Sequence, residues 1–95
     1  MPEAFALTRH AETRSNQRGI HREVMDVLLA YGASKIRHGG EVVYMDQASR
    51  RKARKELGRT TYARLERSLD SYLVLADDGQ VLTCAHRARK FRFKN

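Results

Sequence analysis

Two histidines, His10 and His86, are candidates for acid–base chemistry in this chain of 95 residues. Histidine titrates near neutral pH, so one imidazole can accept a proton while a second imidazole donates one. Cleavage of RNA without a metal needs a base for the 2′-hydroxyl proton, an acid for the 5′-oxygen leaving group and cations around the phosphorane. Exchange of protons between His10 and His86 would meet the first two needs. A structural or exposed role for each histidine is the alternative interpretation.

Arginine is the residue type that best meets the third need, because its guanidinium holds a phosphate through two parallel hydrogen bonds. The chain has arginines close to both histidines, and these would hold the scissile phosphate. A nearby glutamine and a nearby threonine would orient it. The full set of candidate catalytic residues is His10, Arg14, Gln17, Arg18, Thr83, His86 and Arg87.

The segment between Leu7 and Ile20 contains no large apolar side chain, yet its ends are those of a helix. Thr8 is a suitable N-cap, and Gly19 can adopt the left-handed conformation that ends a helix. At about 100° per residue, one stripe of this helix contains a histidine, a glutamine and two arginines. Such a helix either lies solvated on the surface or presents its stripe to a polar site, and both interpretations stay open. The stripe consists of His10, Arg14, Gln17 and Arg18.

The whole chain has a formal net charge of +8, and a run of cations lies in its second half. This imbalance indicates an anionic partner, most simply a nucleic acid. Each cation can neutralise a phosphate and release a counterion, which gives affinity without sequence specificity. The alternative interpretation of the run is a solvated helix face whose charge keeps the protein soluble. The run consists of Arg50, Arg51, Lys52, Arg54, Lys55 and Arg59, opposed within it only by Glu56.

The last residues of the chain alternate cations with aromatic side chains. On an extended strand this pattern can stack a base and bind a phosphate. It can equally bury the aromatic rings on a sheet while the cations face water, since strand side chains alternate between two faces. The candidate nucleic-acid-binding residues here are Arg89, Lys90, Phe91 and Arg92.

Several other classes of protein lack support in the sequence. The single cysteine, Cys84, has no partner for an intramolecular disulfide and is interpreted as a small buried residue. No further ligands accompany Cys84 and His86 at a zinc spacing, so we expect no metal. Nucleotide-binding and serine-hydrolase motifs are absent, so we expect no cofactor. No apolar run approaches the roughly 20 residues of a membrane span, which favours a cytoplasmic protein with no membrane partner.

Three helices are expected after the polar one, over residues 21–31, over residues 47–57 and from residue 60 onward. The first is amphipathic and should pack on the core, whereas the second is mostly charged. Apolar side chains recur at helical spacing in the third helix as well. The apolar positions are Val24, Val27 and Leu28 in the first of these helices and Tyr62, Leu65 and Leu69 in the third.

Two β-hairpins are expected, over residues 34–45 and 72–86. Gly39-Gly40 and Asp78-Gly79 are turn sequences that accept the positive φ angles of tight hairpins. Helices and hairpins in this order favour a single α+β domain over residues 1–95, in which helices pack on one small antiparallel sheet.

Three segments together resemble a bacterial domain family of unknown function. They are residues 8–20, the helix that ends at Tyr31-Gly32, and residues 78–87. That family has an HxxxRxxQRGI helix, and its last hairpin ends in a threonine followed by a histidine-arginine pair. It is similar to the RelE/ParE and BrnT-type toxins, which are small α+β ribonucleases or toxin-like domains with helices packed on an antiparallel sheet. The resemblance implies a RelE-like architecture with the polar helix beside the strand that contains Thr83 and His86. The helix over residues 47–57 is more basic than the family pattern.

These observations lead to one leading hypothesis and two alternatives. The leading hypothesis is a toxin-like RNA-binding protein with metal-independent endoribonuclease activity. A non-catalytic nucleic-acid-binding module and a protein-interaction domain are the alternatives. The partners expected are RNA and, by the resemblance, a cognate antitoxin or the ribosome, with a homodimer as a further option.

Overall fold

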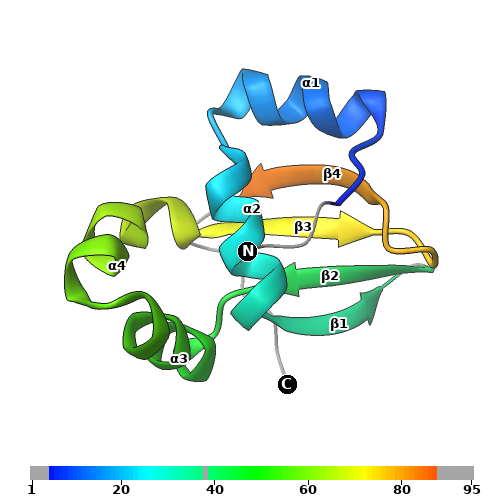
Figure 1. The fold of residues 1–95 in the computed structure, drawn as a ribbon. Helices are drawn as coiled ribbons and strands as arrows, with labels where there is room; N and C mark the ends of the chain where they lie inside the picture. The colour runs from blue at the N-terminus through cyan, green and yellow to red at the C-terminus, as the bar shows by residue number, and fades with distance from the viewer. Residues whose placement is uncertain (1–4, 38, 88–95) are drawn as a thin grey trace.

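The computed structural model describes residues 5–37 and 39–87. In this part of the chain, pairs of strands follow groups of helices, in the order that the sequence predicts (Figure 1). The helices are α1 (Arg9–Arg18), α2 (Arg22–Tyr31), α3 (Gln47–Leu57), α4 (Arg59–Leu65) and the short 3-10 helix η1 (Glu66–Leu69). The strands are β1 (Ala33–Arg37), β2 (Gly40–Tyr44), β3 (Ser71–Leu75) and β4 (Val81–His86).

The four strands form one antiparallel sheet in the order β1-β2-β3-β4. Both expected hairpins are present, and β2 pairs with β3 to join them. Gly39 and Gly79 have φ angles of 80° and 86° in the two connections, which a residue with a Cβ adopts only under strain. The helices pack on this sheet, so the expected α+β class is confirmed.

Helix α2 crosses one face of the sheet and provides much of the core (Figure 1). Its residues Val24, Val27 and Leu28 are buried, as their helical spacing predicts. Cys84 of β4 is fully buried on the same core, and burial raises the pKa of its thiol. A buried thiol with a raised pKa is unreactive, so Cys84 packs as a small apolar side chain.

Helix α1 lies along β4, at the edge of the sheet (Figure 1). Ala11 is its only buried residue, so apolar burial contributes little to its docking. The chain just before α1 pairs with β4 instead: the Thr8 amide donates to the carbonyl of Val81 at 3.0 Å, and the Val81 amide donates to Ala6 at 2.9 Å. The Thr8 hydroxyl also caps the helix by accepting from the amide of Ala11.

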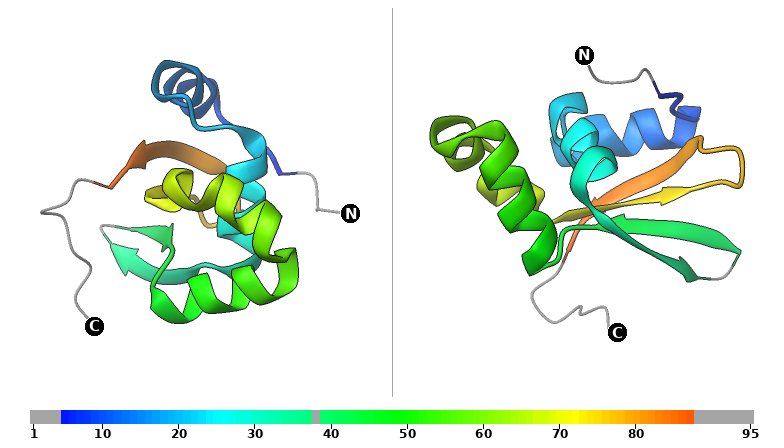
Figure 2. Two further views of the ribbon diagram at one scale, coloured as in Figure 1. Left: turned by 90° about the vertical axis from the view of Figure 1, so that its left-hand side faces the viewer. Right: turned by 60° about the horizontal axis from the view of Figure 1, so that its bottom comes forward.

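Helices α3 and α4 form a separate layer at the end of the sheet away from the two hairpin turns (Figures 1 and 2). Helix α3 buries only Ser49 and Ala53, which are small, so most of its surface stays open to solvent. Gly58 ends α3 with a φ of 86°, and α4 begins at the next residue. The layer is tied to α2 by Arg64 of α4, which donates two hydrogen bonds, of 3.0 and 2.8 Å, to Glu23 of α2.

The N-cap of α3 provides a test of how this layer is held. Asp46 accepts from the amide and the hydroxyl of Ser49 at 2.8 and 2.7 Å, and these bonds lower the pKa of the Asp46 carboxyl. Asp46→Ala should therefore lower the free energy of unfolding by about 0.5–2 kcal/mol at neutral pH. The contribution is complete above the pKa of an unfolded aspartate, about 3.9, and is lost as the pH falls through the lower folded value.

Urea unfolding of wild type and Asp46→Ala between neutral and strongly acidic pH measures this difference. The exposed turn residue Asp77 makes a suitable control as Asp77→Ala. A gap between wild type and Asp46→Ala that stays constant down to the lowest pH would contradict the ionised cap.

Candidate functional site

The predicted stripe of α1 lies at the surface. His10, Gln17 and Arg18 are exposed, and Arg14 is half-buried. The Nε of Arg14 donates to Nε2 of His10 across 3.5 Å, which is a long and weak hydrogen bond. Within the stripe, the structure therefore brings His10 and Arg14 together one helical turn apart.

His86, the last residue of β4, has both ring nitrogens engaged by protein atoms. Its Nε2 lies 2.7 Å from the carbonyl oxygen of Arg18, which can only accept, so Nε2 carries a hydrogen and donates. Its Nδ1 lies 3.2 Å from Oγ of Ser71, and that hydroxyl is also 2.7 Å from the carbonyl of Ser68. His86 thus connects the end of α1 to the start of β3 through its two ring nitrogens, and this role is structural.

His10 and His86 lie at opposite ends of the contact between α1 and β4. The Thr8 hydroxyl donates to the carbonyl of Leu82 near the start of α1, whereas His86 meets the carbonyl of Arg18 at its end. His10 and Arg18 are eight residues apart, which is about 12 Å along a helix axis. The structure therefore does not bring the two predicted proton-exchanging residues together.

Thr83 and Arg87 are directed away from α1. The Cys84 thiol faces the carbonyl of Ala11, and side chains alternate along a strand, so the half-buried Thr83 points to the opposite face of the sheet. The Nη1 atom of Arg87 donates to the carbonyl of Met45 at 3.1 Å, and its guanidinium lies 5.5 Å from the centre of the Tyr44 ring. Arg87 therefore fixes the end of β4 against the end of β2.

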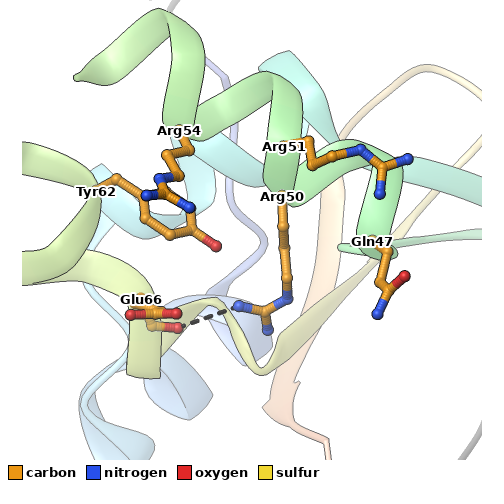
Figure 3. Close-up of a pocket in the computed structure, with 6 residues that line it drawn as sticks. All are labelled: Gln47, Arg50, Arg51, Arg54, Tyr62 and Glu66. Carbon is orange, nitrogen blue, oxygen red and sulfur yellow. Dashed lines mark hydrogen bonds between the residues drawn. The ribbon is translucent and has the colours of Figure 1, made fainter. Parts of the chain in front are cut away.

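The cations of α3 gather around a hollow of about 270 Å³ between α3 and the α4–η1 segment (Figure 3). We call it the α3 hollow. Arg50 is half-buried on its wall, where it pairs with Asp70 and donates to the carbonyl of Glu66 at 3.5 Å. The residues that line the α3 hollow are Gln47, Arg50, Arg51, Arg54, Tyr62 and Glu66.

A second, shallower hollow of about 510 Å³ adjoins the first and shares Arg51 and Arg54 with it. Its other lining residues are Lys55, Gly58 and Arg59, so it has no acidic member. Together the two hollows form one surface, which we call the basic surface. Its exposed cations are Arg51, Arg54, Lys55 and Arg59.

The remaining predicted nucleic-acid-binding residues have different positions. Lys52 is exposed on α3 but lines neither hollow. The predictions for Arg89, Lys90, Phe91 and Arg92 lie outside the described residues.

Three lining residues, Gln47, Tyr62 and Glu66, were not among the predicted site residues. Gln47, Arg50, Arg51 and Arg54 stand at positions i, i+3, i+4 and i+7, so the helical stripe could have been found from the sequence. Tyr62 could not, because its spacing with Leu65 is that of an ordinary core residue.

Within residues 5–37 and 39–87, no three histidine, cysteine or acidic side chains cluster closely enough to hold a metal ion. In the same part of the chain, every helix is too short or too polar to cross a membrane. No protein-family model matches the sequence, and no curated protein or solved structure is significantly similar to the chain. The resemblance to toxin-like domains stays a prediction.

Proposed function

We propose that this protein binds RNA in the cytoplasm and holds the phosphate backbone on the basic surface. The observation that carries the proposal is the display of four exposed cations around two adjoining hollows. The side chains of Arg51, Arg54 and Lys55 make no hydrogen bond or ion pair with any residue that the structure describes. These three side chains are therefore available to an anionic partner.

The cations of α3 also repel one another. Like charges three and four residues apart on a helix destabilise it by about 0.2–0.5 kcal/mol for each pair. Arg51, Arg54 and Lys55 have this spacing, and no core contact explains their presence, because α3 packs through Ser49 and Ala53. A polyanion would relieve the repulsion and release its own counterions. The resemblance to RNA-cleaving toxins favours RNA over DNA as that polyanion.

The arrangement supports binding better than cleavage. A general base needs a free nitrogen within reach of the substrate hydroxyl, and both nitrogens of His86 already meet protein groups. His10 lies at the far end of α1 from His86. Cleavage is tested by incubating RNA with the protein in EDTA. If wild type produces RNA fragments and neither His10→Ala nor His86→Ala does, the protein is a metal-independent ribonuclease.

A salt series with wild-type protein and a single-stranded RNA tests the proposed function. If Arg51, Arg54, Lys55 and Arg59 each contact a phosphate, log K should fall linearly with log salt concentration, with a slope of about −3. This value follows from about −0.7 for each contact on a single strand. Fluorescence anisotropy of a labelled oligonucleotide measures the slope.

The proposed function fails if the RNA does not bind, or if its affinity is independent of salt. Tight binding of an acidic protein in place of RNA would instead identify a protein-interaction domain. A cognate antitoxin is the partner that the resemblance predicts for that outcome.

A further inference from the structure

Tyr62 has an unusual position in the α3 hollow. Its side chain belongs to the core, and the residue is only 8% exposed. Its hydroxyl makes no hydrogen bond with another described residue, although tyrosine hydroxyls usually find a partner when they are buried. Figure 3 shows the hydroxyl end of Tyr62 turned into the hollow, between α3 and η1.

The hydroxyl of Tyr62 is also reached by solvent. Among the described residues, no side-chain polar atom is both fully buried and without a hydrogen-bond partner. Since Tyr62 lines the α3 hollow, the solvent that reaches its hydroxyl enters through that hollow. The hydroxyl of Tyr62, at the end of a buried ring, can therefore donate a hydrogen bond to a ligand in the α3 hollow.

The other donors around the α3 hollow come from α3. Gln47, Arg50 and Arg54 lie on one stripe of that helix, and Arg51 lies at the rim shared with the second hollow. Arg50 is held in place by Asp70 and the Glu66 carbonyl, and it still has further N–H groups to donate. The wall formed by α3 and Tyr62 therefore presents several hydrogen-bond donors and three cations.

Such a wall matches a phosphate monoester better than a phosphate inside a strand. A terminal phosphate has three free oxygens and a charge of about −1.5 to −2 at neutral pH, whereas an internal phosphate has a single charge. Glu66 stands on η1, across the hollow from α3 (Figure 3). Its carboxylate disfavours an anion on the η1 side of the hollow, so a bound phosphate is expected to lie against the arginines of α3.

We infer that the α3 hollow holds the terminal phosphate of an RNA strand, with Tyr62 as a donor to it. The inference rests on the proposed function and adds the part of the strand that is recognised. The rest of the strand then lies over the second hollow, because Arg51 and Arg54 line both. Lys55 and Arg59 contact its internal phosphates.

The experiment compares one short RNA in three forms, with a 5′-phosphate, with a 3′-phosphate and with hydroxyls at both ends. A hydrogen bond to a charged group changes affinity by about tenfold or more, so one phosphorylated form should bind wild type at least tenfold more tightly than the unphosphorylated RNA. Tyr62→Phe keeps the buried ring and removes only the donor. It should remove most of this preference, about tenfold, and should change the affinity for the unphosphorylated RNA much less.

Tyr31→Phe is the matched control, since Tyr31 is half-buried on α2 and lines neither hollow. It should keep the full preference. Gln47→Ala, at an exposed position, tests the same hollow without touching the core and should also reduce the preference. Equal affinity of wild type for all three RNAs overturns the inference and leaves the proposed function intact. A preference that survives both Tyr62→Phe and Gln47→Ala overturns it as well.

The last measurements test whether inorganic phosphate and a nucleoside monophosphate bind to the protein. Binding of each is detected by broadening of its phosphorus NMR signal. These measurements separate a strand end from a free phosphate as the source of the group. If no RNA binds, but either small probe binds wild type and is weakened by Tyr62→Phe, the phosphate site is supported and RNA is wrong as its source. If neither the RNAs nor the small probes bind, both proposals are wrong.

Discussion

Replacing Arg51, Arg54 and Lys55 together with glutamine is expected to weaken binding of single-stranded RNA about 100-fold at a salt concentration of about 0.1 M. Each lost phosphate contact removes the release of about 0.7 counterion, so three contacts should flatten the slope of log K against log salt concentration by about 2. The three side chains are exposed, so the substitutions should leave the fold intact. Circular dichroism and urea unfolding verify that the variant is folded before its affinity is measured.

A second triple variant separates a defined surface from the effect of net charge alone. Arg9→Gln, Lys35→Gln and Arg37→Gln remove the same charge from α1 and β1, outside the basic surface. This control should retain most of the affinity and most of the slope. If both triple variants lose equal affinity, the RNA is held by diffuse charge, and the basic surface is not its site.

Arg50 is less suitable than Arg51, Arg54 or Lys55 for substitutions that test RNA binding, although it belongs to the same cationic run. From the sequence, Arg50, Arg51 and Arg54 appear equivalent, because all three are arginines on one helix. In the structure Arg50 is half-buried and paired with Asp70, so its removal would disturb the junction of α3 and β3 as well as any ligand. Lys55 makes no such contact and reports on binding alone.

The helices and hairpins were predictable because their signals are local. The spacing of Val24, Val27 and Leu28 defines one apolar stripe, and the glycines at positions 39, 58 and 79 have the positive φ angles that ends and turns require. Helix α3 begins and ends where its N-cap and Gly58 place it. These features depend on side chains within a few residues of one another, so no tertiary information was needed.

The candidate site depends on which elements meet, and periodicity does not contain that information. His10 and His86 were plausible partners only while the alignment of α1 along β4 was unknown. That alignment is set by the Thr8 amide, which pairs with Val81, and by the carbonyl of Arg18, which meets His86. In the same way, Tyr62 has the spacing of a core residue, and only the packing of α4 against α3 shows that its hydroxyl opens into a hollow.

Leu28→Ala is expected to lower the free energy of unfolding by about 2–5 kcal/mol, a large effect for a single truncation. Leu28 is 0% exposed on α2, within the cluster that joins the helices to the sheet. Its truncation removes buried apolar surface and leaves a cavity, because the surrounding side chains relax only in part. A loss of this size is a large share of the total stability of a small domain, about 5–15 kcal/mol.

Urea unfolding at neutral pH measures the loss as a lower midpoint with an unchanged slope. Two matched variants locate its cause. Leu28→Met nearly conserves volume and should cost less than about 1.5 kcal/mol, which assigns the larger loss to the cavity. Ile36→Ala removes similar atoms from a residue that is 77% exposed on β1, and it should change stability by about 0.5 kcal/mol or less. If Leu28→Ala and Ile36→Ala cost the same, α2 does not pack on the sheet through the face that contains Leu28, and the core described above is wrong.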